Sequence, residues 1–289
     1  MANTAGAGRR IILLMLLPAL LFLVFLFIYP FFFAIYMSFT ERGAEGFTLA
    51  NYIRFFTDQW ESRVIGVTLS ISLPVTLLCV ITAVPFAYFM RSGLKHEKIV
   101  TFFLIIPITL GTVLISQGMR TFYGTKGWFS QFLIGTGILS EPLKLVPYNP
   151  GVILSLFIQG FPFAFLMLLG YTSGINPDLE KAAMMLGASK RQTFWKIMFP
   201  LMAPGIAIAF CLNFVMSFSL FPSAVMLGQP AGATRVIAYA AWQWTYEKYN
   251  ANMGSAICVI MAVIEISIIS VVLIWRSRMY KGASIVGKG

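Results

Sequence analysis

The 289-residue sequence is poor in charged and catalytic side chains. Charged residues make up 11% of it, cysteine occurs three times and histidine once, at His96, whereas soluble domains average about 25% charged residues. This scarcity excludes an ordinary soluble protein and leaves few groups for acid–base chemistry. Cys79, Cys211 and Cys258 are widely spaced and each lies in an apolar run, which argues against a disulfide framework and a CxxC metal site. We therefore expect no metal site and no membrane enzyme.

Apolar residues are abundant instead. They form 58% of the chain, and aromatic residues form 15%, which is more than one compact core of this size would bury but which lipid can cover. A membrane-spanning helix needs roughly 20 apolar residues. Six runs meet this requirement: Ile11–Phe39, Val64–Met90, Ile99–Phe122, Gly151–Tyr171, Leu201–Leu227 and Met253–Trp275. The sequence therefore predicts an all-α membrane protein with six spans, kinked at their prolines.

The distribution of Lys and Arg predicts the orientation of these spans. Thirteen cations fall on one side: Arg9, Arg10, Arg91, Lys95, Lys98, Lys181, Lys190, Arg191, Lys196, Arg276, Arg278, Lys281 and Lys288. Eight fall on the other, among six acidic residues: Arg42, Arg54, Arg63, Arg120, Lys126, Lys144, Arg235 and Lys248. Both termini are expected to be cytoplasmic. The net charge of +11 is mostly this bias, so we expect contact with lipid and none with nucleic acid.

We expect a single transmembrane domain over residues 11–278, with cytoplasmic tails at 1–10 and 279–289. The first run also fits a signal peptide, but it is nearly twice as long as a typical apolar region of about 7–15 residues and has no clear cleavage site, so a retained anchor is favoured. On the outer side, Phe47–Phe56 predicts an interfacial helix with Thr48 or Asn51 as its cap. Trp128–Leu133 predicts a second interfacial turn or helix.

The cytoplasmic loop at 176–200 carries the strongest signal. Asn176 suits a helix N-cap, Pro177 suits the first helical position, and Gly187 can take the left-handed conformation that ends a helix. A second helix is expected over Lys190–Met198, before Pro200. The resulting helix-turn-helix exposes a Met-Met-Leu patch. Physical reasoning alone leaves two alternatives open: a knob that docks into a partner, or a helix packed on its own bundle.

The order of residues in this loop resembles the signature of ABC importer permeases. Glu180 and Ala182-Ala183 are followed by Gly187, then nine residues, then Ile197 and Pro200. The resemblance is greatest to permeases of the spermidine/putrescine type. It extends to Asn51-Tyr52, Val84–Phe89, Ile105–Pro107, Thr125–Gly127 and Leu186–Ser189. Two positions depart from the family pattern: Lys181 stands where a glutamate usually precedes the alanines, which puts the charge complement with the ATPase in doubt, and Phe199 replaces a common leucine.

The resemblance implies the other subunits of the transporter. The loop would be a coupling helix that fits a cleft in a cytoplasmic ABC ATPase dimer, which binds ATP and Mg, while this chain binds no cofactor. The other implied partners are a second permease subunit, usually a different chain, and a periplasmic or extracellular substrate-binding protein. The residues expected to contact the ATPase are Glu180, Lys181, Ala182, Ala183, Met185, Leu186, Gly187 and Ala188.

Polar side chains within the spans are candidates for the substrate pathway. These are Gln117, Gln159, Asn213, Ser217 and Glu265. Each has an alternative role in holding helices together in lipid, and Glu265 could instead pair with a partner subunit. Near the outer interface, Arg120 fits a snorkelling side chain. Glu247 and Lys248 fit either interfacial anchoring or contact with the external binding protein.

These observations predict a non-catalytic permease subunit in the bacterial inner membrane. The sequence has no GxxxxGK[ST] phosphate loop, so ATP hydrolysis is assigned to a partner. The single carboxylate in a span favours a small cationic or zwitterionic substrate, such as a polyamine. The alternative is a channel or ion-gradient-driven secondary transporter, which would be expected to carry several charges in its spans.

Overall fold

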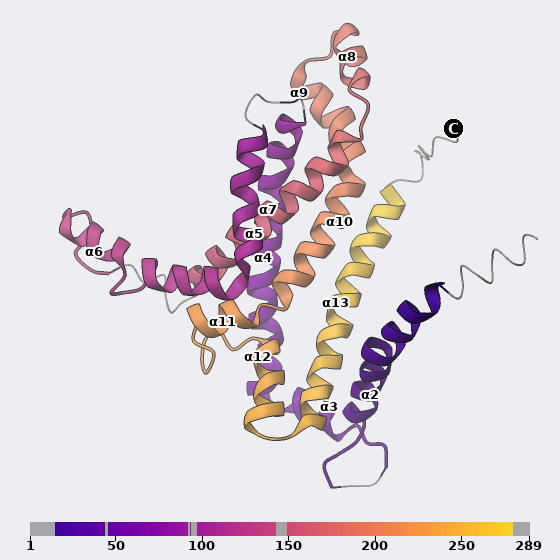
Figure 1. Ribbon diagram of the computed structural model, residues 1–289, viewed down its shortest axis with the longest axis vertical. Coiled ribbons are helices and arrows are strands. Elements are labelled where there is room, and N and C mark those ends of the chain that lie inside the picture. Colours follow the sequence, from indigo (N-terminus) through magenta and orange to yellow (C-terminus); the bar gives the residue numbers. More distant parts are fainter. Residues whose placement is uncertain (1–14, 44–45, 92, 94–96, 143–148, 280–289) are drawn as a thin grey trace, which may run out of the picture. The chain divides into compact units, whose positions relative to one another are not determined.

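The computed structural model describes residues 15–43, 46–91, 93, 97–142 and 149–279 (Figure 1). Every regular element in these residues is a helix, which confirms the predicted class. Six helices are long and apolar enough to cross a membrane: Met15–Ser38, Gln59–Met90, Lys98–Gly135, Asn149–Ser173, Lys190–Phe218 and Ala251–Arg278. Several predicted positions lie outside the described residues: the tail at 1–10, Arg9, Arg10, Lys95, His96, Lys144, Lys281 and Lys288.

The elements follow one another along the chain with short connections. Their bounds are η1 Val24–Ile28, α2 Tyr29–Ser38, α3 Ala50–Thr57, α4 Gln59–Met90, α5 Glu97–Tyr123, α6 Trp128–Gly135, α7 Asn149–Ser173, α8 Asp178–Met185, α9 Lys190–Thr193, η2 Phe194–Met198, α10 Phe199–Phe218, α11 Phe221–Leu227, α12 Ile237–Trp242, η3 Gln243–Glu247 and α13 Ala251–Met279. The chain groups into two compact units. Unit 1 comprises Met1–Ser62 and Ala240–Ala262, and unit 2 comprises Arg63–Tyr239 and Val263–Gly289. The expected single domain over 11–278 stays a prediction.

Unit 2 contains an apolar core. Its fully buried side chains come mainly from α4, α7, α10 and α11 and include Ile71, Phe165 and Met202. These helices approach closely because a small residue lies at the crossing: a Cβ atom on Gly160 would lie 2.7 Å from Asn213 Oδ1 and 2.8 Å from Cys79 Sγ. Small residues let helix backbones approach in lipid, where packing drives association.

Two predicted spans differ from those observed. The third breaks at Gly111, where φ is 72° and ψ is 166°, a conformation that L-residues rarely adopt. Prolines were expected to bend the helices, but this break lies at a glycine. The predicted fifth span, Leu201–Leu227, was wrong at both ends: the helix begins at Lys190 and ends at Phe218, and α11 is a separate short helix that packs on α5 and α7.

Unit 1 contains a helix where an interfacial helix was predicted, but Asn51 does not cap it. The helix is α3, and the Thr48 hydroxyl accepts a hydrogen bond from Ala50 N at 3.1 Å. Asn51 is buried instead and donates from Nδ2 to the carbonyls of Ser38 and Thr40, at 3.2 and 2.9 Å. Asn51 therefore satisfies free carbonyls at the end of α2.

Candidate functional site

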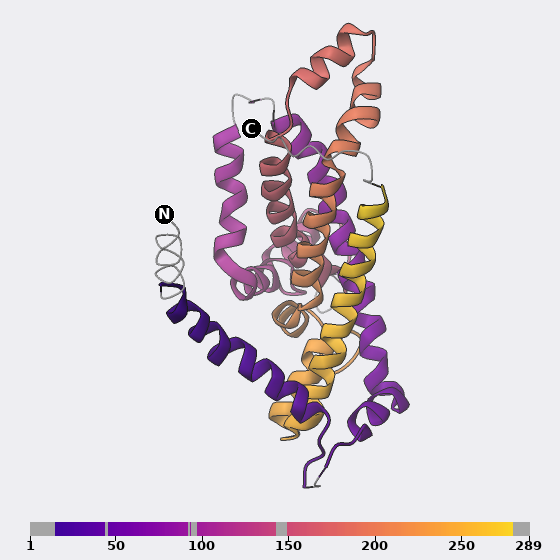
Figure 2. The same cartoon turned by 90° about the vertical axis from the view of Figure 1, so that its right-hand side faces the viewer.

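The loop at 176–200 folds as the predicted helix-turn-helix and lies at one end of unit 2, beside the end of α4 and the start of α5 (Figures 1 and 2). Asn176 Oδ1 accepts from Asp178 N at 2.9 Å, so its side chain caps the first turn although the helix begins one residue later than expected. Gly187 has φ +84°, and Ala188 N donates to Ala183 O at 3.1 Å. Gly187 thus ends α8 as predicted, and Leu186 lies just beyond the helix.

The second helix of the loop is longer than predicted. A reciprocal capping box starts it: Ser189 N donates to Gln192 Oε1 at 2.9 Å, and Gln192 N donates to Ser189 Oγ at 3.3 Å. The helix then runs through the π-turn η2 and into α10 without a break at Pro200. The spacing of Ser189 and Gln192 was a readable signal for this start, whereas a π-turn has no simple sequence signal.

Two apolar side chains form the tip of α8. Met185 and Leu186 are each 89% exposed, and we call this pair the apolar tip. Ala183 faces inward and is buried, while Ala182 and Gly187 are exposed and Ala188 is half-buried. The sequence left open a knob that docks into a partner and a helix packed on its own bundle, and each describes part of α8. The helix packs on α9 and η2, whereas the apolar tip is exposed.

The two charged residues in the signature have different partners. Lys181 Nζ lies 2.9 Å from Asp178 Oδ1, and both side chains are about 70% exposed. Glu180 turns inward, where its Oε1 lies 3.4 Å from Arg91 Nη2 at the end of α4. The Arg91 and Glu180 side chains are only 6% and 21% exposed. Lys181 therefore forms a solvated ion pair, whereas Glu180 forms a largely buried one.

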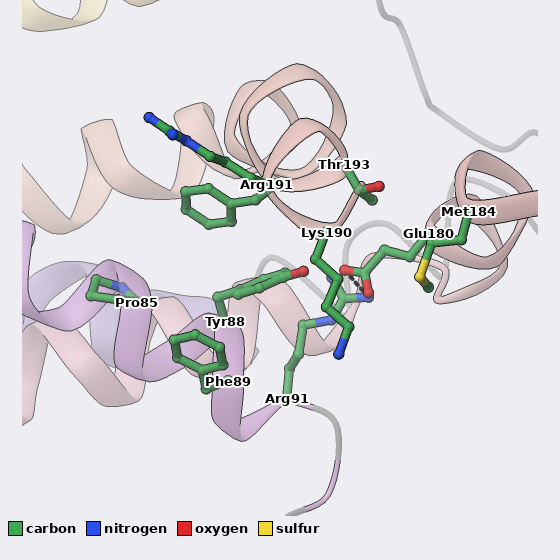
Figure 3. A pocket seen from close by; sticks show the side chains of 10 residues that line it. Pro85, Tyr88, Phe89, Arg91, Glu180, Met184, Lys190, Arg191 and Thr193 are labelled. Atoms are coloured by element: carbon green, nitrogen blue, oxygen red, sulfur yellow. Dashed lines mark ion pairs between the residues drawn. The ribbon is translucent and has the colours of Figure 1, made fainter. Parts of the chain in front are cut away.

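The buried ion pair lines a pocket of about 580 Å³ between α4, α8 and α9 (Figure 3). The pocket has an apolar floor that includes Pro85, Tyr88 and Phe194, and Lys190 and Arg191 lie at its rim. Figure 3 shows the Tyr88 hydroxyl pointing toward the Glu180 carboxylate. Sequence reasoning missed Arg91 as part of this site, because 89 positions separate it from Glu180.

Among the pathway candidates, Asn213 holds two helices together. It is fully buried, and its Nδ2 donates to Gly160 O on α7 at 2.7 Å. Ser217, one turn further along α10, is also buried. Gln159 donates to Ser155 O in its own helix at 3.3 Å. These contacts bring Asn213 close to α7. Asn213 and Ser217 are buried, whereas Gln159 is half-buried.

Glu265 and Gln117 are more accessible. Glu265 is half-buried on α13, and Ser219 Oγ donates to its Oε1 at 3.4 Å. Gln117 is exposed on the part of α5 that follows Gly111. One turn later, Arg120 lines a pocket of about 570 Å³ with Lys126 and the glycines of the following turn. The structure does not bring the five predicted pathway residues together in one site.

A buried hydroxyl cluster escaped the sequence analysis. Ser116 on α5, Ser155 on α7 and Ser223 on α11 are fully buried, with Oγ–Oγ distances of 3.3 to 3.4 Å. Serine is common in membrane helices, so no local signal distinguished these three. Their hydrogen bonds hold α11 against the span that contains Ser155.

In unit 1, Lys248 is bound within its own chain. Its Nζ lies 3.6 Å from the centroid of the Trp244 ring and 3.6 Å from Glu61 Oε1. The guanidinium of Arg54 lies 4.7 Å from the centroid of the same ring. These contacts give Lys248 and Arg54 an anchoring role in unit 1. Within the described part of the chain, no three His, Cys, Asp or Glu side chains gather as a metal site would require.

Sequence relatives include permeases of several transport systems. The spermidine/putrescine transport system permease protein PotB of Escherichia coli (strain K12) is 32% identical over 184 residues, which cover 63% of this chain and 66% of that protein. The same protein of Salmonella typhimurium (strain SL1344) is 32% identical over 183 residues, 63% of each chain. The chain thus matches just under two thirds of the length of these relatives. The putative ferric transport system permease protein FbpB 1 of Haemophilus influenzae is 27% identical, over 93% of this chain and 42% of that protein.

Solved structures share the fold. A chain in the crystal structure of a bacterial ABC transporter involved in the import of the acidic polysaccharide alginate superposes with a TM-score of 0.83 at 19% identity, over 97% of this chain and 100% of that one. A chain of the inward-facing MetNI methionine ABC transporter superposes with a TM-score of 0.57 at 17% identity, over 75% and 93% of the chains.

The family model for the inner membrane component of binding-protein-dependent transport systems matches residues 97–279. The matched region includes α8, the apolar tip and the long helix from Lys190 to Phe218. It agrees with the resemblance drawn from the loop and with the expectation of a non-enzymatic permease subunit. The chain therefore belongs to the family of binding-protein-dependent transport system inner membrane components.

Proposed function

We propose that the chain is a permease subunit of an ATP-driven importer and that α8 couples it to a cytoplasmic ATPase. The observation that carries the proposal is the apolar tip, because two large apolar side chains that are 89% exposed outside the spans are costly unless a partner covers them. The rest of α8 packs on α9 and η2 and includes the buried Ala183, so the apolar tip is carried by a helix that its own loop holds in place.

The proposed orientation puts α8 and both termini in the cytoplasm. Within unit 2, Arg91, Lys98, Lys181, Lys190 and Arg191 lie on the end of α4, the start of α5, and α8 and α9, which share one end of the unit (Figure 1). Short loops rich in Lys and Arg stay on the cytoplasmic side. The assembly would contain an ABC ATPase dimer that binds ATP and Mg, a second permease chain and an external substrate-binding protein.

For the substrate we propose a small cationic or zwitterionic solute, such as a polyamine. Two relatives that are 32% identical are named for spermidine and putrescine. Glu265 offers a half-buried carboxylate in a span, with a hydroxyl donor from Ser219 on one oxygen, and such a group could bind an ammonium ion.

Co-purification from membranes in mild detergent tests the coupling role. The wild-type chain is expected to retain an ABC ATPase, identified by mass spectrometry through its GxxxxGK[ST] loop. A Met185→Asp, Leu186→Asp variant is expected to insert normally and lose this ATPase, because two carboxylates replace the apolar tip. Ile138→Asp is the matched control: Ile138 is also exposed, but it follows α6, away from α8 within unit 2 (Figure 1). Equal retention by the tip variant would overturn the proposal and favour a gradient-driven transporter.

A further inference from the structure

Arg91 joins three elements at the end of unit 2 that carries α8. Its backbone lies directly after α4, where its N–H donates to Ala87 O at 3.1 Å. Its Nη2 lies 3.4 Å from Glu180 on α8, and its Nη1 lies 3.4 Å from the sulfur of Met198 in η2. One nearly buried guanidinium at the end of a span thus contacts both helices of the loop. Figure 3 shows its ion pair with Glu180.

The rest of α8 is tied to its own loop. It packs on α9 and η2, and both belong to the continuous helix from Lys190 to Phe218. Gly174 and Gly187 lie near the two ends of α8. The backbone connects α8 to α7 and α9 and not to α4. The ion pair with Arg91 therefore adds an attachment between α8 and the end of α4.

The burial of the pair makes the separation of its two charges costly. A charge taken out of water is stable only when its partner is present and well placed. The Arg91 side chain is 6% exposed, so separating α8 from α4 would leave a buried, uncompensated cation. The exposed Lys181–Asp178 pair has no such constraint, because water can replace either partner.

From this geometry we infer that Arg91 is a positioning residue that makes α8 and the end of α4 move together. The inference rests on the proposed coupling role of α8. A displacement that an ATPase imposes on the apolar tip would reach α4 through Glu180 and Arg91, as well as α10 through η2. This role explains why the acidic residue is Glu180 here, although the family pattern has a glutamate at position 181. The Glu180 carboxylate binds Arg91 at the end of α4. The cleft of the ATPase would then contact the apolar tip and Lys181, whose charge is paired with Asp178.

The test measures the distance between α4 and α8 in the full chain. Spin labels replace Ile81 on α4 and Leu179 on α8, both exposed, after the three native cysteines have been changed to alanine. Distances are recorded by pulsed electron resonance for the purified permease and for its complex with the ATPase, with and without ATP and vanadate. The variants are Arg91→Met, Glu180→Gln and the reversed pair Arg91→Glu, Glu180→Arg. Lys181→Met is the matched control.

We expect one narrow distance distribution, unchanged by ATP, in the wild-type and Lys181→Met chains. Arg91→Met and Glu180→Gln should keep the ATPase but broaden the distribution, and the reversed pair should narrow it again. Uptake of labelled spermidine per ATP hydrolysed should fall in the two single variants, because part of the displacement of α8 would no longer reach α4.

Three results would overturn the inference. These are an unchanged distribution in both single variants, a reversed pair that stays as broad as they are, or an equal broadening in Lys181→Met. If Arg91→Met fails to insert, Glu180→Gln alone decides the outcome. Failure of the wild-type chain to retain an ATPase would instead reject the proposed function. The two failures can be told apart, because the label distances in the isolated permease report on the ion pair without the ATPase.

Discussion

Met185 is apolar but exposed, and Asn213 is polar but buried. The apolar side chain of Met185 is 89% exposed, whereas the amide of Asn213 has no exposed surface. Outside the spans water surrounds the chain, so an uncovered apolar side chain indicates a surface for a partner. Inside the spans the surroundings are apolar, so a polar side chain holds helices together when it finds a partner. An apolar side chain outside the spans and a polar side chain inside them must therefore be interpreted by different rules.

The largest effect on stability should come from the crossing beneath Asn213. Gly160→Ala places a Cβ atom 2.7 Å from Asn213 Oδ1 and 2.8 Å from Cys79 Sγ. Overpacking of this kind costs about 1–3 kcal/mol, and we expect a clear fall in the melting temperature of the detergent-solubilised chain. Gly170→Ala in the same helix is the control, because no atom lies within 4 Å of the added Cβ. Equal stability of the two variants would show that α7 does not need this close approach.

Asn213→Leu should have a smaller effect. It removes the 2.7 Å hydrogen bond to Gly160 O, and one such bond between membrane helices is worth about 1 kcal/mol. The melting temperature should fall while the affinity for transported substrate stays the same. Ser217→Ala serves for comparison, since Ser217 is buried on the same helix. A changed KM for transport with unchanged stability would indicate that Asn213 contacts substrate. It would contradict the structural role that distinguishes Asn213 from Met185.

Glu265→Gln separates pathway chemistry from packing. Glu265 is half-buried and bonded weakly to Ser219, at 3.4 Å, so the free energy of unfolding should stay within about 0.5 kcal/mol of wild type. A hydrogen bond to a charged group is worth about 1.5–3 kcal/mol, and uptake of labelled spermidine at low concentration should fall about tenfold or more. Uptake equal to that of wild type would argue against a cation site at this carboxylate.

The smallest effect is expected at Lys181. Its pair with Asp178 is solvated on both sides, so Lys181→Ala should change stability by at most about 0.5 kcal/mol. Retention of the ATPase should also be unchanged, because the apolar tip remains. A large loss of ATPase from this variant would mean that charge, rather than apolar contact, dominates the docking surface.

Local signals in the sequence were sufficient for α8 and insufficient for contacts across the bundle. Asn176 and Gly187 act through hydrogen bonds and backbone angles within a few residues, so their roles could be predicted. The break at Gly111 was missed because a glycine in an apolar run permits a positive φ without requiring it. The pairing of Arg91 with Glu180 and the separate helix α11 depend on tertiary packing, which one sequence does not contain.

The π-turn η2 accommodates one extra residue between α9 and α10. Each residue of an α-helix turns the chain by about 100°, and a π-turn contains one residue more than the α-helical turn it replaces. Because the wider turn accommodates the extra residue, deleting one residue within Phe194–Met198 would restore an ordinary helical turn and leave Asn213 facing Gly160. The same deletion elsewhere in α10, before Asn213, would rotate Asn213 by about 100° relative to the preceding helix.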